Sequence, residues 1–147
     1  MCYSVMDIAK YTINRCIDLD RPITNLQLQK ILYYIQGEYM KFNNGNLLFQ
    51  DVIIATKYGA MIPNVYYKFN QYSSSNIYDT QEINITIESN VKKIIDPVII
   101  NKSKLSSWKL VEDNHNELPW KKTFKNGGEI ISNSIMEEFF YIINKYF

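Results

Sequence analysis

Residues with chemically reactive side chains are few and lie far apart in the sequence. The chain has one histidine, His115, and two cysteines, Cys2 and Cys16. A zinc site takes three or four such ligands, and neither cysteine has a partner at metal-ligand spacing. We therefore expect no metal, and we interpret His115 as a hydrogen-bonded structural residue. No pair of carboxylates stands out as a general acid and base, so no catalytic residue is expected.

Phosphate, nucleic acid and membrane binding have equally little support in the sequence. The pair Gly127-Gly128 is not a glycine-rich phosphate loop. A net charge of +1 gives no basic surface for nucleic acid. No apolar run is long enough to span a membrane, and a secretory signal is missing. We expect a cytoplasmic protein without cofactor whose many aromatic residues serve to bind another protein.

The elements that position these residues are organised around a helix predicted over residues 25–42. Thr24 can cap its first turn, and Gln27 completes a capping box. Its apolar stripe, which we expect to be buried, consists of Leu28, Ile31, Leu32, Ile35, Tyr39 and Phe42. The face opposite this stripe carries Lys30, Tyr33, Gly37 and Lys41. This second face either forms another core surface or meets a partner.

Two segments have the character of strands. Residues 52–56 are β-branched and short, and residues 82–87 alternate between apolar and polar side chains. We expect these two segments to pair in a small antiparallel sheet. Helical patterns elsewhere give a total of about six helices. The fold class is mainly α (α+β), in a compact single domain spanning residues 1–147.

Three stretches resemble the signature of the Panacea domain, the family of SocA-like antitoxins and phage-associated GepA-like proteins. Residues 23–37 resemble that family's T-N-L-x-L-Q-K-L-L-Y-x-x-Q-G, and residues 57–66 its K-Y-G-P-V-V-P-x-V-Y. His115, followed by Pro119 and Trp120, resembles its H-x-x-x-P-W. The resemblance runs from about residue 5 to the C-terminus.

The resemblance implies a non-enzymatic antitoxin that neutralises a toxin by direct contact, in some members by presenting it to a protease. The expected contact residues are Lys30, Tyr33, Tyr58, Gly59, Pro63 and Tyr66. As an alternative to contact, Gly59 and Pro63 can serve only to shape a strand-to-helix corner, and Lys30 only to satisfy buried carbonyls. The expected structural residues are Thr24, Leu28, Gln29, Trp108, His115 and Trp120, with the last three as core residues.

Other functions remain open on the sequence alone. A phage- or mobile-element-encoded inhibitor of a host defence nuclease, similar to an anti-CRISPR protein, fits a small aromatic-rich binder equally well. An enzyme would need a pocket with carboxylates around His115. Residues 73–104 match the family poorly, so we hypothesise that they determine the choice of partner. Ala60 stands where the family usually has proline, and this leaves the loop less rigid.

Overall fold

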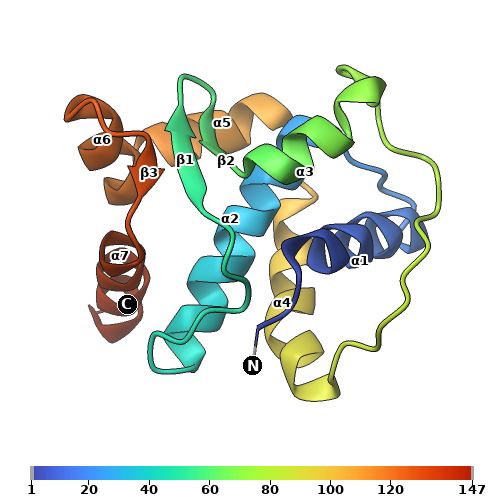
Figure 1. Cartoon of the computed structure of the whole chain (residues 1–147), viewed down its shortest axis with the longest axis horizontal. Helices are drawn as coiled ribbons and strands as arrows, with labels where there is room; N and C mark the ends of the chain where they lie inside the picture. Colours follow the sequence, from blue (N-terminus) through green and yellow to red (C-terminus); the bar gives the residue numbers. More distant parts are fainter. Residues whose placement is uncertain (1, 147) are drawn as a thin grey trace.

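One long helix runs through the middle of the molecule. The computed structural model describes the backbone of residues 2–146 and the side chains of residues 2–141. Helix α2 (Asn25–Phe42) packs against α1 (Val5–Asp18) and α4 (Ser89–Lys102) on one side. On another side it contacts α7 (Asn133–Tyr146), as Figure 1 shows. The other helices are α3 (Pro63–Lys68), α5 (Ser107–His115), α6 (Leu118–Lys125) and the 3-10 turn η1 (Asn70–Tyr72).

The start of α2 follows from its own sequence. The Thr24 hydroxyl accepts the Gln27 backbone N–H, and the Gln27 side chain accepts the Thr24 backbone N–H. This capping box satisfies two otherwise unpaired donors, so the helix begins where the sequence predicts. The Thr24 hydroxyl also lies 3.0 Å from that of Ser107, which connects the starts of α2 and α5. The predicted mainly α fold is confirmed, with seven α-helices in the described residues.

The sheet is smaller than the helices and lies beside α2. Strand β1 (Ile53–Thr56) confirms the strand predicted at 52–56 and pairs antiparallel with β2 (Gly59–Met61). Its other edge pairs with β3 (Ile130–Ile131). The predicted pairing with residues 82–87 is wrong, because both edges of β1 are occupied and that segment is an irregular loop.

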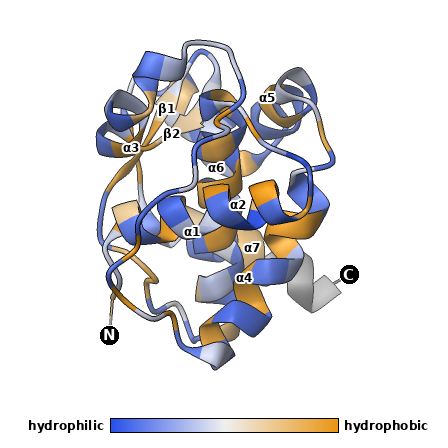
Figure 2. Ribbon diagram, turned by 90° about the vertical axis from the view of Figure 1, so that its right-hand side faces the viewer, coloured by the Kyte–Doolittle hydropathy of each residue, from blue (hydrophilic) through white to orange (hydrophobic). Residues whose placement is uncertain are grey.

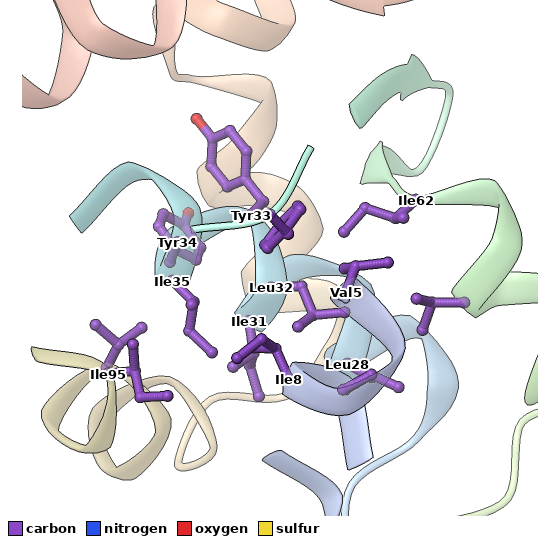
Figure 3. Packing of buried hydrophobic residues seen from close by; sticks show 14 of the residues in the cluster. Val5, Ile8, Leu28, Ile31, Leu32, Tyr33, Tyr34, Ile35, Ile62 and Ile95 are labelled. Atoms are coloured by element: carbon purple, nitrogen blue, oxygen red, sulfur yellow. The ribbon is translucent and has the colours of Figure 1, made fainter. Parts of the chain in front are cut away.

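The main core lies between α2, α1 and α4. Figure 3 shows side chains of α2 pointing toward Val5 and Ile8 of α1 and toward Ile95 of α4. Along α1 and α4 hydrophobic residues alternate with hydrophilic ones, as expected for helices with one buried face (Figure 2). The predicted stripe is wrong at its end, since Phe42 is 60% exposed. Phe42 lies in the last turn of α2, at the edge of a hollow rather than under a neighbouring helix.

The opposite face of α2 is also buried, which confirms the second core surface. The Tyr33 ring points away from α1 and α4 (Figure 3) and packs edge-on against Phe140 of α7. Gly37 faces the same phenyl ring so closely that a Cβ at this position would overlap it. A glycine on the second face therefore marks the crossing of α2 and α7.

Candidate functional site

The turn between β1 and β2 is held in place by side chains of α2 and α5. The Lys30 ammonium donates a hydrogen bond to the Ala60 carbonyl at 2.8 Å, and the Asn114 amide oxygen accepts the Ala60 N–H at 2.9 Å. Gly59 directly precedes Ala60, at the start of β2, and has a φ of +95°. A Cβ there would lie 2.7 Å from Asn114 Oδ1 and 2.8 Å from Lys30 Cε, so only glycine fits.

The end of α5 and the first turn of α6 hold the other side of this turn. The His115 Nε2 atom lies 2.9 Å from the Lys57 carbonyl oxygen in a hydrogen bond, and the Trp120 indole N–H donates to the Thr56 carbonyl at 2.6 Å. The two rings stack with centroids 4.0 Å apart. These contacts give the H-x-x-x-P-W segment a structural use, which is to fix the hairpin turn.

Polar residues on α2 also fix the segment that leads into α3. The Gln29 side chain accepts the Ile62 N–H at 2.9 Å and donates to the Asn25 side chain at 2.9 Å. Asn25 in turn donates to the Tyr66 carbonyl at 3.0 Å. Pro63 is the first residue of α3, where its fixed φ suits the helix and its missing N–H costs nothing.

Tyr33 has a structural role that corrects its expected place in a contact surface. Its hydroxyl donates to Glu117 at 3.0 Å, and the Tyr34 hydroxyl donates to the same carboxylate at 2.7 Å. Asn114 completes the network by donating to the Tyr34 hydroxyl at 3.1 Å. Burial raises the pKa of the Glu117 carboxyl above its ordinary value, an effect that the two hydroxyl donors oppose. Tyr33 itself is fully buried and offers no surface.

A groove of about 520 Å³ opens beside the hairpin and brings together three of the predicted contact residues, Lys30, Tyr58 and Tyr66. Gly59 and Pro63 do not line it. Trp108 does, which corrects its prediction as a core residue, because it is 66% exposed. Its indole meets the Tyr58 ring edge-on at 6.1 Å. The groove thus presents aromatic side chains from the hairpin, α3 and α5.

Sequence reasoning missed several residues that build this site. Asn25, Asn114 and Glu117 are polar and mostly buried, and each binds groups that are distant in the sequence. The available signal was the polar trio of Asn25, Gln29 and Lys30, spaced to share one side of a helix.

Lys30 is the most unusual group at the groove. Its side chain is 1% exposed, and burial lowers the pKa of its amine to about 7. No salt bridge in the described part of the chain includes it. The groove's other charged lining residue is Lys57, whose ammonium lies 5.1 Å from the Tyr58 ring centre. Of these two lysines only Lys57 is exposed, because Lys30 lies beneath the hairpin.

Other surfaces show less agreement with the predicted contacts. A hollow of about 660 Å³ lies between α2, α4 and α7, with Glu38, Lys41 and Lys102 among its lining residues. None of the predicted contact residues lines it. Among the described residues, no group of three or more His, Cys, Asp or Glu could hold a metal ion. No described helix has the length and apolar character needed to cross a membrane.

The segment 73–104, hypothesised to determine the choice of partner, has two parts. Residues 89–102 form α4, whose buried side chains pack in the core. The preceding loop reaches the groove only at Ser73 and Ser74. Partner choice by this segment therefore stays a hypothesis, and the structure restricts its contribution at the groove to the two serines.

Comparison with protein families gives one match. A family model described as "Antitoxin SocA-like, Panacea domain" matches residues 28–121, more than half of the chain. This range includes Lys30, the β1–β2 hairpin and Trp120, although it is shorter than the resemblance noted in the sequence. No curated protein and no solved structure matched the chain.

Proposed function

The chain belongs to the SocA-like Panacea family of antitoxin-like proteins, and from this premise we propose that it neutralises a toxin in the cytoplasm by direct, non-enzymatic contact. An antitoxin role implies a protein partner. The observation that supports the proposal is the groove beside the hairpin, where Tyr58, Tyr66 and Trp108 lie together. Tyr and Trp are the residues that most often dominate binding energy at protein interfaces.

The rigidity of the groove supports this choice of surface. The hairpin turn is held by hydrogen bonds from Lys30, Asn114, His115 and Trp120. Binding to a surface that is already fixed loses less conformational entropy than binding to a loop that must be ordered. Trp108 stays exposed in this arrangement, and no other described aromatic ring except that of Tyr58 contacts its indole.

Co-expression with the product of the neighbouring gene tests the proposal. Growth is measured with each protein alone and with both together, and a pull-down measures the complex. We expect the neighbour to be toxic alone, growth to be restored together, and a stable complex. Immunoblotting of the toxin separates neutralisation by binding from presentation to a protease. A harmless neighbour or no complex would contradict the proposal and direct the pull-down to host defence nucleases instead.

Two exposed aromatic residues provide a matched pair of variants for the same assay. Trp108 lines the groove at 66% exposure, whereas Tyr67 is 72% exposed and does not line it. Trp108→Ala is expected to weaken the complex at least about tenfold, as truncation of an interface anchor does. Tyr67→Ala is expected to bind like the wild type. Equal effects of the two variants would place the contact elsewhere.

A further inference from the structure

Helix α6, which lies at one end of the molecule beside β1 and β3 (Figure 1), has a basic face that the net charge of the chain conceals. Residues 118–128 contain three lysines and neither Asp nor Glu, so the rest of the chain is net acidic. Lys121, Lys122 and Lys125 are exposed, and no ion pair among the described side chains includes them. At these positions the three side chains lie within about 100° of the helix circumference.

The neighbouring carboxylates leave this face with a surplus of positive charge. Glu117, directly before α6, accepts hydrogen bonds from two tyrosines of α2 and is therefore turned toward that helix. Glu129 follows the helix and forms no ion pair in the described structure. Glu137 and Glu138 of α7 line a separate hollow, and none of the residues that line it belongs to α6. The charge of the face is therefore complementary to an anionic partner.

A stack of aromatic rings lies on the same helix. The rings of His115, Trp120 and Phe124 follow one another with centroids 4.0 and 4.7 Å apart and interplanar angles of 28° and 17°. The Trp120 indole donates to the Thr56 carbonyl, which fixes the stack to β1. Phe124 ends the stack and is 44% exposed, and among the described rings only Trp120 contacts it. A further flat ring can therefore be added on its outer face.

Cations beside an exposed aromatic ring are the combination that binds single-stranded nucleic acid. Lysines neutralise the phosphates, and an unpaired base stacks on the ring whatever its identity. An acidic protein segment would use the lysines equally well, but its carboxylates would leave the near-parallel stack without a role. A base in a duplex already has a partner on each of its faces. The two features together favour a single strand.

We propose that α6 binds single-stranded nucleic acid, with phosphates against Lys121, Lys122 and Lys125 and one base stacked on Phe124. This function goes beyond the antitoxin role and does not depend on it, because no α6 residue lines the groove beside the hairpin. With three lysines the contact is weak and sensitive to salt, in the range of non-specific binding, where Kd is on the order of 10–100 μM.

Fluorescence anisotropy of labelled oligonucleotides tests the inference on the full chain. Oligothymidylate and oligouridylate of about ten nucleotides are titrated with the protein between about 50 and 200 mM salt. We expect both to bind, with a slope of log K against log salt of about −2, the value for three phosphate contacts on a single strand. An abasic strand of the same length, which keeps the phosphates, is expected to bind at least about fivefold more weakly. Oligoglutamate of that length should also bind more weakly, because it offers no base.

Two triple variants with the same change in net charge separate this face from the charge of the whole chain. Replacing Lys121, Lys122 and Lys125 together with Gln is expected to weaken binding at least about tenfold and to bring the salt slope close to zero. The control replaces three exposed lysines outside α6, which are Lys68, Lys93 and Lys104. It is expected to bind nearly like the wild type.

A change at Phe124 tests the stacking separately. Phe124→Leu keeps an apolar side chain but removes the ring, so it is expected to weaken the normal strands at least about fivefold and to leave the abasic strand unchanged. Tyr67→Leu, at another exposed aromatic residue, is the control and should change neither. Thermal unfolding of each variant verifies that it is folded.

Several outcomes would overturn the inference. These are no binding of either oligonucleotide at about 50 mM salt, where such contacts are strongest, equal weakening by the two triple variants, or equal affinity for normal and abasic strands. Tighter binding of oligoglutamate would assign the face to an acidic protein instead. Growth rescue by a chain that binds no oligonucleotide would reject this inference alone, and oligonucleotide binding without rescue would reject the antitoxin role alone.

Discussion

Lys30 has a chemistry that depends on its position in the fold. A lysine in water keeps its charge at neutral pH, but burial without a carboxylate partner lowers the pKa of Lys30 from 10.5 to about 7. From the sequence, this residue had two interpretations, as a partner contact or as a donor to buried carbonyls. The hydrogen bond to the Ala60 carbonyl shows that it serves the second purpose, and at 1% exposure it offers almost no surface to a partner.

The lowered pKa of Lys30 predicts how stability depends on pH. Between pH 7 and 10.5 the unfolded chain holds this proton more tightly than the folded chain, so the free energy of unfolding rises with pH. From pH 7 to 9 the gain amounts to about 2 kcal/mol. It should be visible as the difference between wild type and Lys30→Met in urea denaturation. Parallel curves for the two proteins would contradict it.

Comparison with Lys30→Met is needed because a second buried group, Cys16, also has a shifted pKa and contributes to the pH dependence of stability. Burial raises the pKa of the Cys16 thiol to about 11, so its contribution is present at lower pH and lost as the pH rises toward that value. Lys30→Met retains Cys16, and the subtraction cancels its effect. The window from pH 7 to 9 also ends below the ordinary pKa of tyrosine.

Gly59 gives a second prediction for a single residue. Gly59→Ala is expected to lower the free energy of unfolding by about 2–4 kcal/mol, because alanine resists a positive φ and its Cβ displaces Asn114 and Lys30. Gly127→Ala is the control, since it also has a positive φ but no atom within 4 Å of the added Cβ. Its loss should be about 1 kcal/mol. Equal losses in denaturant unfolding would show that crowding at residue 59 does not matter.

Elements whose cause is local were predictable from the sequence. The bounds of α2 follow from a capping box and a turn, which involve residues close in sequence. Strands β2 and β3 have three and two residues, too short for any periodicity, and each is defined by its pairing with one edge of β1. The alternation at 82–87 does not follow burial, since Ile87 is buried and Ile85 is exposed, and the segment has no strand to pair with.

The site was predictable only where its residues belong to a distinctive local pattern. Gly59 and Lys30 could be selected because they lie in segments with a recognisable order of residue types. Trp108 was misplaced because a large apolar residue is usually buried, and its exposure depends on which face of α5 meets the core. Asn114 could not be found, since its two partners, Ala60 and Tyr34, are 54 and 80 residues away.

The crossing of α2 and α7 gives a prediction for a pair of elements. Gly37→Ala improves helix propensity by about 1 kcal/mol, but its Cβ overlaps the Phe140 ring, and overpacking costs about 1–3 kcal/mol. We expect a net loss of stability. In a double-mutant cycle with Phe140→Leu, the two changes should couple favourably by at least about 0.5 kcal/mol. Additive effects would mean that α7 moves aside without cost.

Across the whole molecule, side chains of α2 and α5 connect the hairpin and α3 to the central helix. The Ala60 and Ile62 amides have side-chain acceptors, Asn114 and Gln29, rather than strand or helix partners. In the loop before α4, the amides of residues 82–86 donate no hydrogen bond within the described structure. The molecule thus combines a groove fixed by hydrogen bonds with a loop whose amides lack them.

This contrast predicts the pattern of native-state hydrogen exchange. The Ala60 and Ile62 amides should exchange only through global unfolding, like the middle of α2, whereas residues 82–86 should exchange nearly unprotected. Gln29→Met should lower protection of Ile62 selectively, because its acceptor is lost while that of Ala60 remains. NMR measurement of individual amides checks this. Exchange of Ala60 as fast as the loop would mean that the hairpin opens locally, and a partner would then have to order the groove instead of finding it formed.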